Sequence, residues 1–210
     1  MSDAEYKQKF KELEQKFKDA EKQNGKEVDI RKLSQKELDD RLGAKKSCKI
    51  NDYLILAEAR MRAEGQNTDG FDSNNIYDSA KQEGDKIIKG DFEVVDPDRL
   101  LRKAGVKGDI SWGRETDPSK FNDTLVEQLD KGNPVMMVLD DKHGEIIYGY
   151  EKSGDNLRFL LHDVGYQGDT YLNSKTWQPY QGNEKYSTRN GILPMFGGKP
   201  RSASKLLYLK

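Results

Sequence analysis

Three residues of this 210-residue chain have side chains that could together hydrolyse an amide bond, namely Cys48, His143 and Asp163. A cysteine attacks a carbonyl carbon as its thiolate. A histidine can take the thiol proton and later give it to the leaving amine, while a carboxylate orients the imidazole. Cys48 is the single cysteine and the chain has two histidines. The candidate groups for thiol chemistry are therefore few.

The residues after Cys48 predict a helix that begins at this cysteine. Apolar side chains recur at helical spacing up to Gly65, at Ile50, Tyr53, Leu54, Ala57 and Met61. A helix N-terminus stabilises negative charge and therefore favours a thiolate. The alternative interpretation is that Cys48 is a small buried hydrophobic residue.

The second half of the chain predicts an antiparallel sheet that carries His143 and Asp163. Its expected strands are Val135–Leu139, Glu145–Glu151, Leu157–His162 and Leu206–Leu209, with hairpin turns at Asp140–Gly144 and Ser153–Asn156. His143 then lies in a turn and Asp163 follows the returning strand. Simple pairing sets Asp163 opposite Ile146, about 10 Å along the strand from His143. A β-bulge or the twist of the sheet has to close that offset.

The other histidine, His162, precedes Asp163 directly in the same expected strand. Adjacent strand residues point to opposite faces, so only one of this pair can face Cys48. We expect His143 to be the base. A zinc site built from Cys48, His143, His162 and a carboxylate would lack any short ligand spacing. The sequence therefore predicts no metal and no cofactor.

Between Cys48 and the sheet, the sequence predicts further helices and loops. Asp96-Pro97 and Asp117-Pro118 each predict a helix start, and Gly105 and Gly132 the corresponding ends. Weaker signals predict a helix at Ile76–Ile88 and an extended segment at Phe92–Val95. The polar segment 66–75 predicts a loop, and it is no calcium loop because Ile76 stands where the final carboxylate belongs. Helices first and an antiparallel sheet second indicate an α+β fold.

Residues 1–45 form a charged N-terminal extension, and residues 46–210 form the expected catalytic domain. A narrow apolar stripe from Tyr6 to Ala20 predicts a helix that ends at Gln23–Gly25, and a second short helix is expected from Gln35 to Gly43. The stripe needs a partner surface. It either packs back on the domain or mediates self-association as a coiled coil.

Composition and charge narrow the class of protein. The net charge is −1, the isoelectric point is near 6.2, and no basic cluster is interleaved with aromatic residues, which argues against nucleic acid as a partner. The charged N-terminus and the lack of an 18-residue apolar run predict neither a secretory signal nor a membrane span. A single cysteine fits a reducing cytoplasm, and it equally fits a protein released by lysis.

The order of these motifs resembles that of the papain-like cysteine peptidases. The resemblance rests on a helix-starting Cys48, then Gly132-Asn133-Pro134-Val135, His143 with Gly149-Tyr150 following, and His162-Asp163. It is most similar to the bacterial branch that includes the double-glycine leader peptidases of bacteriocin export. The resemblance implies a papain-like fold in which an N-terminal helical part packs on a C-terminal antiparallel sheet. It also implies that Cys48 is the nucleophile, His143 the base and Asp163 the orienting acid.

Two positions depart from that family. Cys48-Lys49-Ile50 stands where the family usually has Cys-Gly-Pro, and residues 42–47 hold no glutamine for the oxyanion hole. Gln35 is the nearest glutamine, and it lies too far upstream for the family spacing.

Two functions are therefore expected from the sequence. The first is a cysteine peptidase or amidase that acts on a peptide or a peptidoglycan cross-bridge, as a phage lysis enzyme or an effector. The second is a catalytically inactive papain-like module that binds a peptide, which the missing glutamine favours.

Overall fold

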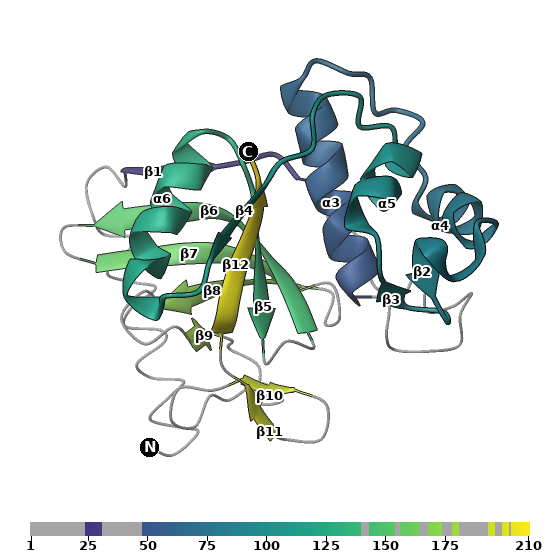
Figure 1. Cartoon of the computed structure of the whole chain (residues 1–210). Coiled ribbons are helices and arrows are strands. Elements are labelled where there is room, and N and C mark those ends of the chain that lie inside the picture. The colour runs from purple at the N-terminus through teal and green to yellow at the C-terminus, as the bar shows by residue number, and fades with distance from the viewer. Residues whose placement is uncertain are drawn as a thin grey trace.

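The computed structural model describes residues 24–30, 48–139, 143–153, 156–163, 168–173, 178–180, 193–195, 199–201 and 203–210. Within these ranges the chain is α+β, with four α-helices and strand pairs that are all antiparallel. In Figure 1 the sheet and α6 form one side of the molecule, and α3, α5 and α4 form the other. The expected helices at 6–20 and 35–43 lie outside the described residues.

The helix predicted from Cys48 is confirmed as α3 (Cys48–Ala63). The helix after Asp96 is α5 (Pro97–Ala104), where the Asp96 side chain accepts the Arg99 amide and Gly105 ends the helix with φ 107°. After Asp117 the chain begins with the 3₁₀ turn η2 (Pro118–Lys120) and continues as α6 (Phe121–Asp130). The boundaries at Asp96, Gly105 and Asp117 follow from local capping chemistry, which is why the sequence predicted them.

The segment between α3 and α5 differs from expectation. Helix α4 (Ser73–Lys81) begins earlier than predicted because the Asp72 side chain accepts the amides of Asn74 and Asn75. The expected helix to Ile88 is wrong. After the 3₁₀ turn η1 (Gly84–Lys86), the chain forms a short hairpin of β2 (Ile88–Lys89) and β3 (Glu93–Val94).

The main sheet has the order β4-β12-β5-β6-β7-β8-β9. Its central strands β5 (Val135–Leu139), β6 (His143–Ser153) and β7 (Asn156–Asp163) form the predicted meander, and β12 (Ala203–Leu209) includes the predicted last strand. The remaining strands were not predicted: β4 (Trp112–Glu115), β8 (Gly168–Asn173), β9 (Gln178–Tyr180), and a separate pair of β10 (Leu193–Met195) and β11 (Lys199–Arg201).

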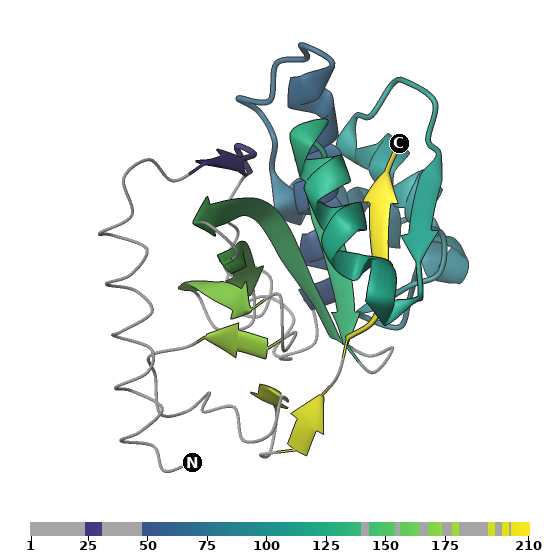
Figure 2. The ribbon, with the colours of Figure 1, turned by 90° about the vertical axis from the view of Figure 1, so that its left-hand side faces the viewer.

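A β-bulge shifts the register between β6 and β7. Gly149 pairs with Leu160, but Ile147 pairs with Leu161 and Ile146 with His162. The extra residue in β6 moves the end of β7 one residue closer to the start of β6 than simple pairing would. Figure 2 shows β6 as a long, bent strand. The offset between His143 and Asp163 therefore shrinks from three residues to two, about 7 Å along a strand.

The sheet is covered on both faces by separate apolar clusters. One face packs against α3 and the α4 and α5 region, and contributes Met136, Val138, Ile146, Tyr148 and Leu160. The other face packs against α6, and contributes Val135, Met137, Leu139, Ile147, Phe159, Leu161 and Leu206. Odd and even positions of β5 thus separate cleanly between the clusters, as strand alternation requires.

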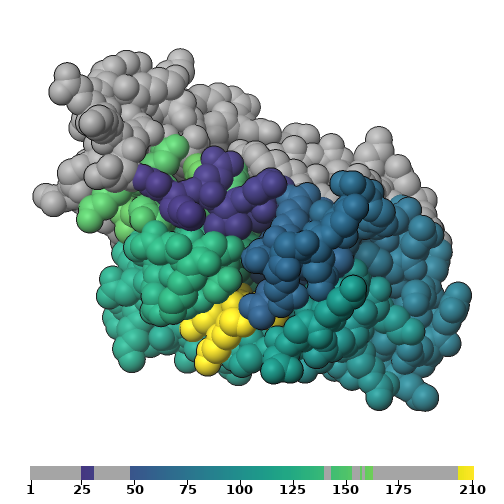
Figure 3. Space-filling model, turned by 90° about the horizontal axis from the view of Figure 1, so that it is seen from above, coloured from purple at the N-terminus to yellow at the C-terminus, as the bar shows by residue number. Residues whose placement is uncertain are grey.

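The N-terminal extension supplies a strand of this sheet. Residues Asn24–Glu27 form β1, which pairs antiparallel with Gly149–Lys152 of β6. Asn24 and Gly25, which were expected with Gln23 to end a helix, lie in β1, and the expected helix itself is outside the described residues. Seen from above, the segment that begins with β1 lies on the surface between α6 and α3 (Figure 3). Residues 24–27 are therefore part of the main sheet.

Two glycines allow β1 to approach β6 this closely. A Cβ built at Gly149 would lie 2.6 Å from the Lys26 carbonyl oxygen and 2.8 Å from Leu160 Cδ1. A Cβ built at Gly25 would overlap the Tyr150 carbonyl oxygen. Gly149 belongs to the Gly-Tyr motif after His143, and the close backbone approach supplies a physical reason for a glycine there.

We expect Gly149→Ala to lower the free energy of unfolding by about 1–3 kcal/mol, because its methyl group must displace β1 or Leu160. Urea denaturation measures the loss, and amide hydrogen exchange should show Lys26 and Glu27 exchanging faster. Gly70→Ala is the matched control, since nothing lies within 4 Å of a Cβ built there. Equal stability of the two variants would contradict the close packing of β1.

Candidate functional site

Cys48 is the first residue of α3, and its side chain is buried, with 7% of the residue exposed. The helix is held in place by apolar side chains that are fully buried against the sheet and α5, among them Ile50, Leu54 and Ile55. No acidic residue lies in the first turn of α3. The first turn of α3 therefore adds no carboxylate of its own that would oppose a thiolate at Cys48.

The front of α3 touches the backbone of β6 through Asp52 and Gly144. Asp52 is fully buried. A Cβ built at Gly144 would overlap the Asp52 carboxylate and would lie 2.6 Å from Met136 Cε. Because Gly144 has no side chain, the helix can lie directly on the strand at this point.

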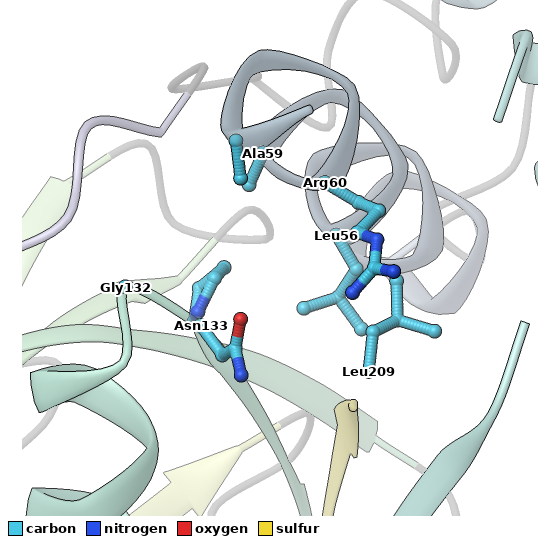
Figure 4. Close-up of a pocket in the computed structure, with 8 residues that line it drawn as sticks. Leu56, Ala59, Arg60, Gly132, Asn133 and Leu209 are labelled. Carbon is cyan, nitrogen blue, oxygen red and sulfur yellow. The ribbon is translucent and has the colours of Figure 1, made fainter. Parts of the chain in front are cut away.

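This contact fixes which end of α3 meets the start of β6. Cys48 precedes Asp52 by one helical turn, about 6 Å along the axis, and His143 directly precedes Gly144. At the other end of α3, Leu56, Ala59 and Arg60 line a small pocket with residues 132–134 and Leu209 (Figure 4). The helix therefore runs from the His143 end of β6 towards the start of β5.

The structure places His143 as the first residue of β6, and not in the turn that the sequence predicted. It is 1% exposed and pairs with Leu139, which belongs to the cluster under α6. The next pair, Gly144 with Val138, lies towards α3. Strand alternation thus directs the His143 side chain to the α6 face. The structure brings the segments of Cys48 and His143 to one corner, but it places the imidazole on the face opposite α3.

His162 lies on the face towards α3, because it pairs with Ile146 of that cluster. It is 4% exposed. Of the two histidines, His162 and not the expected base His143 therefore lies on the α3 face. His162 is nevertheless two residues deeper along the sheet than Gly144, on the side away from Cys48. Along the strand direction, His162 is therefore farther than His143 from the end of α3 at which Cys48 lies.

Asp163 is the last residue of β7, and its backbone pairs with Gly168 of β8. Continuing the register from Ile146 and His162 sets Asp163 level with Glu145. The His143 ring is much closer to Glu145 itself, since His143 Nε2 lies 3.7 Å from Glu145 Oε1. Both side chains are buried, with 2% and 0% of each exposed.

Sequence reasoning missed three residues of this corner: Asp52, Gly144 and Glu145. A carboxylate inside a helix with buried apolar neighbours was a visible signal of a close contact, whereas Gly144 was expected in a turn and not in a strand. They gain meaning only when α3 and β6 are known to touch. Glu145 was expected to begin a strand, and nothing in the sequence distinguishes its burial from solvent exposure.

The ionisation of Tyr53 reflects the charge at this corner. Burial is the main reason why the pKa of the Tyr53 phenol is raised above its ordinary value, and the nearby Asp52 carboxylate raises this pKa further. The ring of Tyr53 also packs edge-to-face on Trp112, with centroids 5.8 Å apart. Tyr53 therefore interacts both with the buried Asp52 carboxylate and with the ring of Trp112.

Three further observations concern ligands and membranes. Among the described residues, no group of three His, Cys, Asp or Glu side chains is arranged to hold a metal ion. None of the helices in the described ranges is long and apolar enough to span a bilayer. The pocket at Ala59 and Arg60 lies about 16 Å along α3 from Cys48, so it is separate from the corner at His143.

No protein-family model matches this chain, and no curated protein matches its sequence.

A double-mutant cycle tests the contact between α3 and β6. We expect Gly144→Ala to destabilise the protein by about 1–3 kcal/mol, because the new methyl group meets Asp52 and Met136. The cost should fall by at least about 0.5 kcal/mol in an Asp52→Ala background, where that obstacle is gone. Urea denaturation of all four chains measures the coupling. Strictly additive effects would show that the helix does not touch Gly144.

A second test uses the raised pKa of Tyr53. A phenol whose pKa is raised on folding stabilises the protein fully below the unfolded value of about 10, and this stability is lost as the pH rises through the folded value. Tyr53→Phe should therefore weaken the decline in stability above pH 10, measured by denaturant unfolding at pH 8 and 10.5. Asp52→Asn should lower the Tyr53 pKa, measured by NMR of ¹³C-labelled tyrosine. An unchanged Tyr53 pKa would contradict the proximity of the Asp52 carboxylate to the Tyr53 phenol.

Proposed function

We propose that this chain is a papain-like cysteine hydrolase that cleaves a peptide or peptidoglycan amide bond with Cys48 as the nucleophile. The observation that carries the proposal is the contact between Asp52 and Gly144. It sets the first turn of α3 beside the first residues of β6, where the family resemblance expects the base. A cysteine at the start of a buried helix and a histidine that opens a neighbouring strand are the two elements that thiol hydrolysis requires.

The proposed reaction requires the His143 imidazole, which the register directs to the α6 face, to reach Cys48 around the start of β6. Cys48 then transfers its proton to His143, and its sulfur forms a bond with the carbonyl carbon of the substrate. The tetrahedral intermediate then expels the amine, which leaves with the proton from His143. Water hydrolyses the resulting thioester and restores the thiol. The backbone N–H of Cys48, at the N-terminus of α3, is a candidate donor to the oxyanion.

The proposed substrate class follows from the family resemblance. A peptide amide is the bond that papain-like enzymes attack, and a peptidoglycan cross-bridge is the form of it that a lysis enzyme would meet. Cleavage of a host protein by an effector uses the same chemistry.

A catalytically inactive module that binds a peptide is the second candidate, and one observation favours it. His143 lies on the α6 face of the sheet, and Cys48 is 7% exposed. In such a protein the sulfur would pack as a small hydrophobic side chain, and the corner would serve only to fix α3 on the sheet.

Alkylation of Cys48 distinguishes these functions. An ordinary thiol is almost fully protonated at pH 6, so it reacts slowly with iodoacetamide. We expect Cys48 to be labelled at least about tenfold faster than free cysteine at pH 6, because the helix N-terminus and an imidazole favour the thiolate. His143→Ala should abolish this advantage, whereas His162→Ala, the matched control, should retain it. Slow labelling of all three chains would favour the binding module.

Substitutions at Cys48 and His143 should reduce hydrolysis, and the substitution at Cys48 should leave the stability of the protein nearly unchanged. Cys48→Ser should eliminate cleavage of purified peptidoglycan or of a peptide library, and His143→Ala should reduce it by about 10²–10⁴-fold. The melting temperature of Cys48→Ser should stay within about 2 °C of the wild type, since a single atom changes at the first residue of a helix. A large loss of stability would instead assign Cys48 to the core.

A further inference from the structure

We propose that the open edge of β4 pairs with the same edge of a second copy of this chain. Strand β4 (Trp112–Glu115) stands at one end of the main sheet, and among the described strands it pairs with β12 alone. Figure 1 shows β4 beside β12. The inference concerns assembly, so it does not depend on the proposed reaction.

The hydrogen bonds between β4 and β12 use alternate residues of β4. The Lys210 amide donates to the Ser111 carbonyl oxygen at 2.9 Å, and continuing the register from Leu209 and Trp112 sets these two residues opposite each other. Antiparallel strands exchange hydrogen bonds at every second pair. Gly113 and the residue at position 115 therefore bond to β12.

The other two residues of β4, Trp112 and Arg114, direct their N–H and C=O groups away from β12. An edge of this kind is a template for another strand. We place Gly113 of two antiparallel copies at a two-fold axis, which sets Trp112 of each copy opposite Arg114 of the other. Each of these two pairs exchanges two backbone hydrogen bonds, so the edge satisfies itself in a closed dimer.

The side chains on the α3 face of β4 match this pairing. Trp112 and Arg114 are two positions apart and share one face, on which Trp112 packs against the cluster under α3. Arg114 is exposed. In the dimer, the Arg114 guanidinium of one copy lies on the Trp112 indole of the other as a cation–π contact. The indole N–H donates to Asp98 Oδ1 at 2.6 Å, so a carboxylate is present at the same place to attract the guanidinium.

The α6 face of β4 offers an aromatic ring at the proposed axis. A Cβ built at Gly113 would overlap the ring of Tyr208, which therefore lies directly over this glycine. Tyr208 is half-buried. Opposite residues that exchange no hydrogen bonds have α-carbons about 4.5 Å apart, so the two Tyr208 rings come next to each other at the axis. Aromatic side chains are enriched at protein interfaces.

These contacts favour a second copy over an unrelated peptide strand. The backbone bonds accept any sequence, but the side-chain contacts require a cation and an aromatic residue two positions apart in antiparallel order. Strand β4 is itself such a strand, and two-fold symmetry forms each contact twice. The edge is short, so we expect a small interface and a weak dimer.

Two substitutions of Arg114 test the pairing. Arg114→Pro removes an N–H that points away from β12, and proline is tolerated at such positions of edge strands. The bonds of β4 to β12 remain, so the melting temperature should stay within about 4 °C of the wild type. Arg114→Glu reverses the charge beside Asp98 of the other copy. Lys152→Glu is the matched control, because Lys152 is exposed on β6, with β12 and β5 between it and β4.

Sedimentation equilibrium between about 10 µM and 1 mM should show monomers and dimers in exchange for the wild type and for Lys152→Glu. Arg114→Glu should raise the dissociation constant at least about tenfold through like-charge repulsion, and Arg114→Pro should be monomeric. In the wild type, amide hydrogen exchange at Trp112 and Arg114 should slow as the protein concentration rises. Exchange at Gly113 should be slow at every concentration, because its amide bonds to β12.

A wild type that stays monomeric up to about 1 mM would overturn the inference. A dimer that Arg114→Glu leaves unchanged would do the same. If Arg114→Pro fails to fold, amide exchange at Trp112 in the wild type decides, and a rate independent of concentration contradicts the pairing. Phe17→Asp, in the apolar stripe expected at 6–20, should leave the dimer intact. Loss of the dimer in that variant would assign self-association to the stripe and not to β4.

Discussion

The contact of α3 with the backbone of β6 at Gly144 is the constraint on which the candidate site depends. A side chain at this position would overlap the buried Asp52 carboxylate. The absence of a Cβ lets the helix rest on the strand, so the N-terminal turn with Cys48 reaches the level of His143. The rest of α3 is fixed by apolar packing, which is non-directional and could be satisfied at several heights along the helix axis. The close approach of Asp52 to Gly144 fits one of these heights.

The second organising feature is a sheet that is buried on both faces. Strands β5 and β6 contribute to an apolar cluster under α3 and to another under α6. Buried polar groups in such strands are costly unless they are paired. The carboxylate of Glu145 and the imidazole of His143 lie at the start of β6, close enough to interact. The burial of these two polar side chains distinguishes the start of β6 from an ordinary, solvent-exposed strand end.

The N-terminal strand and the bulge complete this arrangement. The bulge between Ile147 and Gly149 shifts β7 by one residue relative to the first half of β6. Beyond the bulge, β5 no longer pairs with β6, and β1 takes its place beside Gly149–Lys152. A single distortion therefore does two things: it brings Asp163 level with Glu145, and it accompanies the change of strand neighbour. The glycine at position 149 serves both, since it permits the close approach of β1.

The sequence by itself determined the elements whose signals are local. Helix α3 follows from apolar periodicity, α5 from the Asp96 cap and Gly105, and the meander from strand patterns and turn residues. It also singled out Cys48 and His143 as candidate partners, and the segments that carry them meet at one corner of the fold. Only the tertiary structure decided on which face each side chain lies, because a strand buried on both faces shows no polar alternation. The same holds for β1 and β4, whose partners are distant in the chain, and for Glu145 and Gly144, whose significance arises from a contact that no local pattern encodes.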